Sequence, residues 1–475
     1  MMKLRITLVC VMVLLVATAA PGEVPVAKST AGDRTGVDVT VYNSNLGLVK
    51  ETRRVDIPAG EGELRFMDVA SRINPVTVHI HSLNSPELFA VLEQNYEYDL
   101  MNEKKLLDKY VGKAIKIIDW NRYQDRKETV EAELLSNNQG QVYRIGGEIY
   151  LGHPGIKVLP ELPENLIAKP TLTWLYQNGG TAPHVLEVSY LTGGISWKAD
   201  YVLIVNEDDT ATDISAWVTI DNKSGATYND AVLQLVAGKV NRAERRPQAR
   251  DALMKGMVME SAAQPQFKEK AFYEYHIYDL QRKTTIKDRQ TKQISLFEAT
   301  SVGIKKEFLV RGTSAHFTNR ARGGKNRNPV AVYITFRNAK DNSLGMPLPE
   351  GIMRLYKRDA GGSQQFIGEY RIEHTPKNEE VSLKTGEAFD IVAERRQQDF
   401  KKLSTKLYET EWEITLKNRK EEDITVGVVE PLFGNWQVIE TSHPYTKVDA
   451  FTVRFDVPVP KDETVTVTYR LRVGI

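Results

Sequence analysis

Apolar and polar residues alternate along most of the chain. The alternation is clearest over residues 37–42, 76–81, 216–220, 330–336 and 464–469. Because successive side chains of a β-strand point to opposite faces of a sheet, these runs predict half-buried strands. Turn-forming residues lie between the runs, for example at 178–180 and 460–463. The pattern predicts an all-β protein built from antiparallel β-sandwich domains in tandem, with little helix.

Two segments depart from this alternation. Residues 102–110 predict a short helix, because Leu106 and Leu107 would lie on one face of it. Residues 393–407 carry many charges and fit either a helix or a solvent-exposed strand. Neither segment is long enough to change the predicted fold class.

Breaks in the strand pattern suggest where domains begin and end. Pro160, Pro163 and Pro170 interrupt a polar stretch and predict a boundary near residue 170. The predicted regions are an N-terminal β-domain at 36–168, a β-sandwich domain at 169–312 and a C-terminal β-sandwich domain at 325–475. Within the middle domain, alternation stops over residues 241–270, which predicts a mobile insertion.

The first 19 residues have the features of a secretory signal peptide. Lys3 and Arg5 precede an apolar run over residues 6–16, and small residues at 17 and 19 suit cleavage after Ala19. An uncleaved anchor is the alternative. The apolar run is shorter than the roughly 20 residues that cross a bilayer, and no later run reaches that length, so no integral membrane span is predicted. We therefore expect an exported protein, periplasmic or at the cell surface.

Charge and cysteine content exclude several classes of protein. The 475 residues include 63 Lys and Arg against 62 Asp and Glu, a formal charge of +1, so no general attraction to nucleic acid is expected. Cys10 is the single cysteine and lies in the predicted leader. The mature chain would therefore lack disulfides, thiolate zinc sites and cysteine nucleophiles.

Two pairs or groups of residues could bind a metal ion. His79 and His81 stand two apart on a predicted strand, so both imidazoles would project from one face. Met254, Met257 and Met259 form a thioether cluster that could hold Cu(I). Ordinary surface alternation and a small apolar patch explain these groups better, and no cofactor is predicted.

A further candidate is the run Ile195-Ser196-Trp197-Lys198-Ala199-Asp200-Tyr201. Trp197 would lie on one face of a strand, where it could grip a sugar or a partner, although core packing is the more common role of such a residue. Lys198 and Asp200 would be neighbours on the other face, which suits a structural ion pair at least as well as catalysis. Motifs of hydrolases, phosphate-binding loops and dinucleotide-binding folds are absent from the sequence.

Several segments share a recognisable pattern of strand aromatics, turn residues and alternating aliphatics, at 169–174, 186–201, 221–225, 235–241, 274–280, 386–390 and 416–420. These segments resemble a widespread bacterial family of unknown function that includes the mucoidy-inhibitor A-like proteins. The resemblance is strongest over about residues 169–475 and extends weakly to 37–100. The resemblance implies a β-sandwich scaffold and no established reaction, and the family name hints at envelope polysaccharide.

These observations favour a non-catalytic binding or structural protein of the cell envelope. Its expected partners are an envelope protein or a polysaccharide, recognised through loops and edge strands. Two alternatives stay open. One is a glycan-active enzyme that uses carboxylates borne on strands. The other is an exported metal-handling protein that uses His79 and His81 or the methionine cluster.

Overall fold

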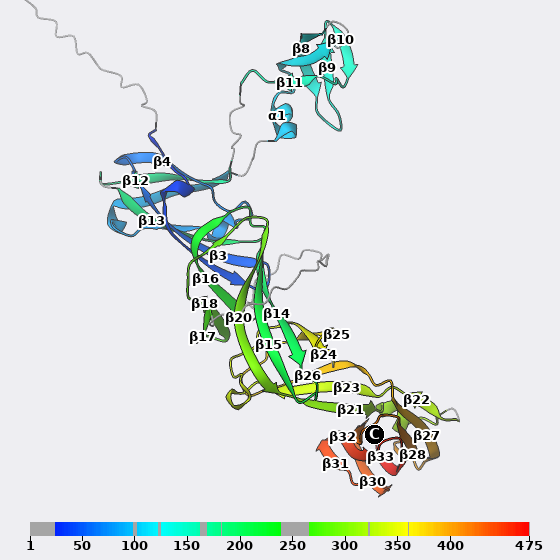
Figure 1. The fold of residues 1–475 in the computed structure, drawn as a ribbon. Coiled ribbons are helices and arrows are strands. Elements are labelled where there is room, and N and C mark those ends of the chain that lie inside the picture. Colours follow the sequence, from blue (N-terminus) through cyan, green and yellow to red (C-terminus); the bar gives the residue numbers. More distant parts are fainter. Residues whose placement is uncertain are drawn as a thin grey trace, which may run out of the picture. The chain divides into compact units, whose positions relative to one another are not determined.

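The computed structural model confirms the all-β fold class (Figure 1). It describes residues 24–97, 102–121, 125–161, 169–181, 183–238, 266–321, 324–359 and 361–474. Within these ranges, α1 (Glu103–Lys109) is the one α-helix, and nearly every other regular element is a strand. Antiparallel pairs predominate among the strand contacts.

The chain divides into two compact units, and strands β2 (Arg34–Tyr42) and β3 (Leu46–Val55) contribute residues to both. The first unit comprises Met1–Val37, Val49–Thr192 and Ser224–Ala226, and the second comprises Asp38–Leu48, Gly193–Lys223 and Thr227–Ile475. The predicted boundary near residue 170 differs from this division. Strand β12 (Thr171–Asn178), just after that point, belongs to the first unit.

The first unit contains a four-stranded sheet in which β12 is central. Its order is β1-β4-β12-β6, with β1 at Val26–Ser29, β4 at Gly60–Met67 and β6 at Phe89–Glu97. Strands β13 (His184–Thr192) and β5 (His79–Ser82) form an antiparallel pair in the same unit. Phe66 and Trp174 are fully buried and meet edge to face, because alternating apolar residues of β4 and β12 face the interior.

A small sheet with its own core lies within residues 103–158 of the first unit. Its order is β10-β9-β8-β7-β11, with β7 at Ala114–Asn121, β8 at Arg126–Ser136, β9 at Val142–Ile145, β10 at Glu148–Leu151 and β11 at Ile156–Val158. The buried residues that fill this core are Leu107, Tyr110, Ile115, Ile117, Ala132, Leu134 and Tyr143. Since α1 supplies Leu107, the helix closes one side of the core. Asn102 caps the first turn of the helix by accepting from the Lys105 N–H.

The second unit begins with long strands. One sheet has the order β20-β15-β14-β24-β25, with β14 at Ile195–Val205, β15 at Ala211–Asn222, β20 at Gln290–Gly303, β24 at Gly351–Arg358 and β25 at Gln364–Ile372. Further strands of this unit are β16 (Tyr228–Ala237), β17 (Phe267–Phe272), β18 (Tyr275–Leu280) and β19 (Thr284–Ile286). Residues 267–270, assigned to the predicted insertion, form part of β17, and most of the rest of that insertion lies outside the described residues.

The C-terminal part of the second unit is a β-sandwich. One sheet has the order β26-β23-β21-β29-β32-β31, with β21 at Lys305–Arg311, β23 at Ala331–Arg337, β26 at Glu380–Glu387, β29 at Ile424–Pro431, β31 at Thr446–Asp449 and β32 at Thr452–Val459. The other has the order β22-β27-β28-β33-β30, with β22 at Asn326–Asn328, β27 at Ile391–Lys402, β28 at Leu407–Asn418, β30 at Asn435–Thr441 and β33 at Thr464–Gly474. Alternate residues of both sheets form one continuous apolar core.

Two local expectations are resolved by the structure. Residues 391–402 form strand β27, so the strand interpretation of the charged segment 393–407 is correct for most of its length.

The strand predicted over 76–81 is only partly correct, because Pro75–Thr77 forms a 3-10 turn and β5 begins at His79. Pro75 fixes its own φ and starts this turn, which leaves Val76 89% exposed.

Candidate functional site

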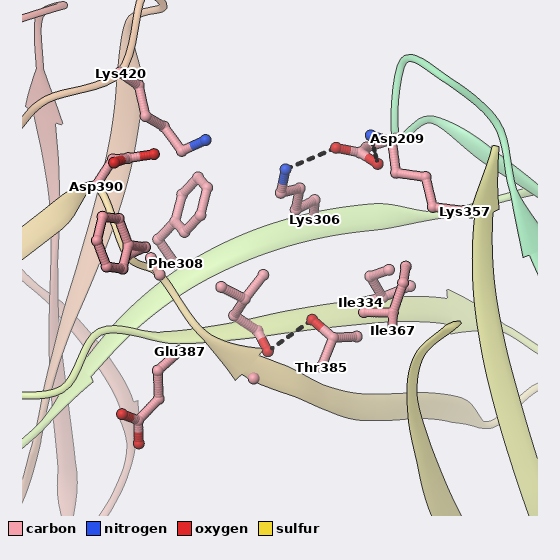
Figure 2. Close-up of a pocket in the computed structure, with 14 residues that line it drawn as sticks. Asp209, Lys306, Phe308, Ile334, Lys357, Ile367, Thr385, Glu387, Asp390 and Lys420 are labelled. Carbon is pink, nitrogen blue, oxygen red and sulfur yellow. Dashed lines mark hydrogen bonds and ion pairs between the residues drawn. The ribbon is translucent and has the colours of Figure 1, made fainter. Parts of the chain in front are cut away.

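An open pocket in the second unit is the best candidate for a functional site. Its volume is about 270 Å³, and it lies where β21, β23, β24, β25 and β26 meet three connecting loops (Figure 2). The lining residues are Asp209, Lys306, Phe308, Val332, Ile334, Lys357, Ile367, Thr385, Gly386, Glu387, Ala388, Phe389, Asp390 and Lys420. We call it the Phe308 pocket, after the buried ring on its floor.

One end of the pocket is built around Asp209, in the turn between β14 and β15. Its backbone is left-handed, with φ at 56°, which aspartate tolerates better than most residues. The carboxylate accepts hydrogen bonds from Lys306 Nζ at 2.7 Å and Lys357 Nζ at 2.5 Å (Figure 2). Burial alone would raise the pKa of Asp209, but these two lysines outweigh it and hold the pKa below its ordinary value. Asp209 therefore stays ionised at neutral pH.

A β-bulge in the edge strand β26 shapes the wall. Val332 pairs with Gly386 and Tyr333 pairs with Lys384, so Thr385 is an extra residue on β26. Gly386 takes a φ of 145°, a conformation that disfavours any side chain. The Thr385 hydroxyl donates to the carbonyl oxygen of Val332 at 3.3 Å. The bulge thereby holds Thr385 against the pocket.

The loop after β26 supplies an exposed aromatic ring. Phe389 is 91% exposed, which is unusual for a large apolar side chain at the rim of a pocket. The loop is anchored on both sides, because the Ala388 N–H donates to the Val330 carbonyl and the Arg419 N–H donates to the Asp390 carbonyl. Phe389 is therefore exposed to solvent on a loop whose backbone is fixed by hydrogen bonds on both sides.

Two ammonium groups share the Phe308 ring. Lys306 Nζ lies 5.4 Å from the ring centre and Lys420 Nζ lies 5.8 Å from it. Lysines at such distances are attracted to the electron-rich face of an aromatic ring. Lys420 also lies 3.7 Å from Glu422. The floor of the pocket therefore combines an apolar surface with fixed positive charge.

A family model described as a domain of unknown function, DUF4139, matches residues 186–435, just over half of the 475-residue chain. The chain belongs to the DUF4139 family. No curated protein matches it. Every residue that lines the Phe308 pocket lies inside the DUF4139 match. The earlier resemblance to a family of unknown function is thereby confirmed.

The structure places Trp197 in the interior of the DUF4139 region. Its side chain is buried, and its indole N–H donates to the carbonyl oxygen of Val236 at 3.1 Å. The Trp197 ring meets that of Tyr278 edge to face. This arrangement is the core packing that we considered the more common role for such a tryptophan, and it offers no surface to a ligand.

Lys198 and Asp200 lie on the same face of β14, as their spacing indicates. Their charged atoms are 3.9 Å apart, but Asp200 makes closer contacts with Arg354 Nη1 at 3.0 Å and the Thr219 hydroxyl at 2.7 Å. These partners come from the neighbouring strands β24 and β15. The group therefore joins three strands of one sheet, and neither residue lines the Phe308 pocket.

His79 and His81 project from one face of β5, with ring centres 5.4 Å apart. His81 Nε2 lies 3.7 Å from Glu187 on the paired strand β13. Across the described ranges, no group of three or more His, Cys, Asp or Glu side chains is arranged to hold a metal ion. The three methionines at 254, 257 and 259 lie outside the described residues.

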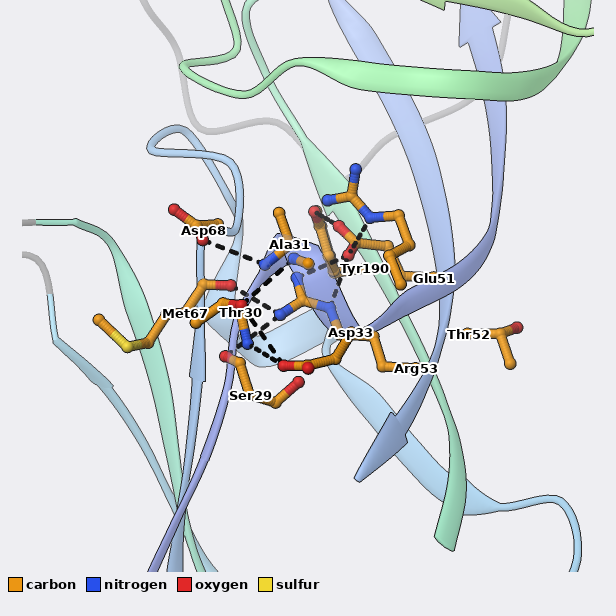
Figure 3. Close-up of polar contacts among 12 residues, drawn as sticks. Ser29, Thr30, Ala31, Asp33, Glu51, Thr52, Arg53, Met67, Asp68 and Tyr190 are labelled. Carbon is orange, nitrogen blue, oxygen red and sulfur yellow. Dashed lines mark hydrogen bonds and ion pairs between the residues drawn. The ribbon is translucent and has the colours of Figure 1, made fainter. Parts of the chain in front are cut away.

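A buried cluster of charged residues lies in the first unit and shares no residue with the Phe308 pocket (Figure 3). Glu51 accepts hydrogen bonds from Arg53 Nη2 at 2.7 Å, Tyr190 at 2.9 Å and Arg34 Nε at 3.0 Å. Arg53 also donates to the carbonyl oxygen of Ser29 at 3.3 Å. Since both oxygens of Glu51 are engaged, the cluster fits a structural role that ties β1 to β3 and β13.

A second buried cluster lies in the C-terminal sandwich. Arg395 donates to Glu430 Oε1 at 2.6 Å and to the Tyr469 hydroxyl at 3.0 Å. Glu430 Oε2 has no hydrogen-bond partner and faces Gly312, where a side chain would collide with it. The cluster lies between the two sheets and lines no cavity described above.

Sequence reasoning did not single out Phe389, Lys420 or Asp209. A weak signal existed, since residues 386–390 and 416–420 were both among the segments of the family resemblance. Only the folded chain brings these loops together beside β21.

Among the described residues, no helix is long and apolar enough to span a bilayer.

Proposed function

We propose that this protein is a non-catalytic binding protein of the cell envelope, and that the Phe308 pocket is its binding site. The observation that carries this proposal is the exposed ring of Phe389 at the rim of a pocket that three lysines also line. An aromatic side chain contributes a large contact area, and exposed apolar groups at a polar rim are typical of binding sites.

The chemistry of the pocket supports binding better than catalysis. A general acid near neutral pH needs a raised carboxyl pKa, whereas the pKa of Asp209 is lowered by its two lysines. Lys306 and Lys357 are in turn engaged by ion pairs with the Asp209 carboxylate. Such paired charges attract and orient a ligand.

The envelope location is part of the same proposal. It is supported by the basic residues, apolar run and small residues of the first 19 positions, which lie outside the described residues. The finer kinship with mucoidy-inhibitor A-like proteins is supported by the matching segments alone, and it agrees with an envelope partner, either a protein or a polysaccharide. Amino-terminal sequencing of the protein from fractionated cells tests export, with a start at residue 20 as the expected result.

Site-specific photo-cross-linking in living cells tests the binding function. A photoreactive phenylalanine analogue would replace Phe389, and the control would carry it at Phe451, which is 54% exposed and does not line the pocket. The expected result is a reproducible cross-linked species from position 389 that position 451 does not give. Equal cross-linking from both positions, or none from position 389, would contradict the pocket as the binding site.

A further inference from the structure

We infer that the Phe308 pocket binds the carboxy-terminus of a protein chain whose last side chain is apolar. This inference rests on the proposed binding function and names the chemistry of the partner. A terminal carboxylate carries a full negative charge next to a single side chain, and both parts have a matching surface in the pocket.

The positive part of the pocket has unused hydrogen-bonding capacity. Asp209 is one carboxylate between two lysines, so the Asp209, Lys306 and Lys357 group keeps a net charge of one positive unit. An ammonium group has three N–H donors, and Lys306 donates one of them to Asp209. Lys420 reaches the same ring from the opposite loop, and its nearest carboxylate is 3.7 Å away. A carboxylate beside Phe308 would therefore gain charge-assisted hydrogen bonds.

The apolar part of the pocket distinguishes a protein chain from a sugar. Val332, Ile334 and Ile367 line it with aliphatic groups that neither donate nor accept hydrogen bonds. A sugar hydroxyl that is buried against these aliphatic groups would lack a hydrogen-bond partner, which costs free energy. A terminal Leu, Val or Phe side chain would instead gain from burying apolar area there.

The size of the pocket favours the end of a chain over its middle. Pockets for drug-sized molecules measure roughly 300–1,000 Å³. The Phe308 pocket, at about 270 Å³, is just below that range and suits one amino-acid residue. The rest of the partner would leave past Phe389, which is 91% exposed and free to contact the preceding residue.

Carboxylates on the rim would repel an anionic ligand. Removing a carboxylate and removing a lysine should therefore change the affinity for that ligand in opposite directions. Asp390 and Lys420 both line the pocket, and Glu387 points away from the ring (Figure 2). Removing the charge of Asp390 should therefore strengthen binding of a carboxylate, whereas removing Lys420 should weaken it. A purely structural role for these residues would not predict opposite effects.

Fluorescence anisotropy on the purified full chain tests the inference. The probes are a short labelled peptide ending in Gly-Leu with a free carboxylate and the same peptide with an amidated end. We expect the free acid to bind at least about tenfold more tightly than the amide, since hydrogen bonds to charged groups contribute about 1.5–3 kcal/mol. Lys420→Met should lower the affinity for the free-acid peptide about tenfold, and Asp390→Asn should raise it about twofold.

Controls separate this inference from the proposed function. Lys420→Arg should keep binding, and Lys461→Met, at an exposed lysine that does not line the pocket, should leave it unchanged. Equal affinity for acid and amide, or binding of an oligogalacturonate in place of the peptide, would overturn the inference. If Phe389 cross-links a partner in cells while the peptide acid fails to bind, only the carboxylate inference is lost. If both experiments fail, the proposed function is lost as well.

Discussion

Glu51 and Glu63 each precede an arginine by two residues, yet they lie in very different surroundings. Glu51 and Arg53 are fully buried and joined at 2.7 Å, whereas the side chains of Glu63 and Arg65 are 31% and 45% exposed. The strength of an ion pair depends on its environment, because solvent screens exposed charges and a buried charge without its partner is costly. The two pairs form a natural comparison within one unit.

Replacing the buried carboxylate should therefore destabilise the protein far more than replacing the exposed one. Glu51→Ala would leave Arg53 buried without the carboxylate to which its guanidinium donates, and we expect a loss of about 3–5 kcal/mol in the free energy of unfolding. Glu63→Ala, the matched control, should cost less than about 1 kcal/mol. Urea denaturation followed by circular dichroism measures both. Similar losses in the two variants would show that Glu51 is not a structural anchor.

His184 makes the stability of the first unit depend on pH. Its side chain is buried, with Nδ1 at 2.9 Å from the Ser82 hydroxyl and Nε2 at 3.1 Å from Asn178 Oδ1. Burial lowers the pKa of His184 below its ordinary value of 6.5. The unfolded chain therefore takes up the proton first, and the contribution of His184 is complete above about pH 6.5 and is lost as the pH falls below it.

Thermal denaturation between pH 5 and pH 8 tests this dependence. The wild-type melting temperature should fall as the medium is acidified through pH 6.5, and part of that fall should disappear in His184→Gln, which cannot take up a proton there. His443→Gln, the same substitution at a half-buried histidine of the second unit, is the matched control. A His184→Gln profile parallel to the wild type over the whole range would refute the assignment.

At the scale of elements, the parallel pairing of β14 with β24 depends on one glycine. Gly351 pairs with Ala199, and a Cβ at Gly351 would overlap the carbonyl oxygen of Ala199. That atom belongs to the backbone of a central strand, so it cannot move aside without breaking ladder hydrogen bonds. Gly36 of β2 is different, because a Cβ there would meet no atom within 4 Å.

We therefore expect Gly351→Ala to lower the free energy of unfolding by at least about 1–3 kcal/mol, the usual cost of overpacking. Gly36→Ala should be neutral or slightly stabilising, because alanine restricts the unfolded chain more than glycine does. Differential scanning calorimetry of both variants measures the difference. If Gly351→Ala melts with the wild type, the close approach of β14 and β24 is not as tight as described.

Strand periodicity predicted much of the secondary structure, since runs at 37–42, 216–220 and 464–469 all lie within strands. Local pattern failed at residues 76–78, where a proline started a turn although the apolar alternation continued. It also could not reveal the Phe308 pocket. Lys306, Phe389 and Lys420 line one pocket only because β21 and the loops after β26 and β28 come together, and such non-local pairing leaves no periodic signal in the sequence.

For the whole molecule, the order of elements along the chain differs from their grouping in space. Residues 103–158 form a small sheet with its own core, and β12 then pairs with β4 and β6, which precede that sheet in the sequence. The proline-rich segment near residue 160 consequently marks the end of the small sheet. The predicted boundary at residue 170 separated β12 from the strands with which it pairs.

Because the small sheet has its own core, damage to it should stay local. Ile117 is fully buried in that core, and Ile117→Ala should cost about 2–5 kcal/mol through lost burial and the cavity left behind. Limited proteolysis should then produce new cuts within residues 103–158, while photo-cross-linking from Phe389 stays at its wild-type level. Loss of that cross-linking would mean that the two regions unfold together.

The bulge at Thr385 and Gly386 has a consequence for solubility. Strand β26 lies at the edge of its sheet, and an unpaired edge invites a strand from another molecule to add to it. The extra residue breaks the regular spacing of donors and acceptors, and Lys384 and Glu387 place charges on either side of it. The irregularity that shapes the wall of the pocket therefore also disfavours edge-to-edge pairing, so a variant that straightens β26 by deleting Thr385 should aggregate more readily.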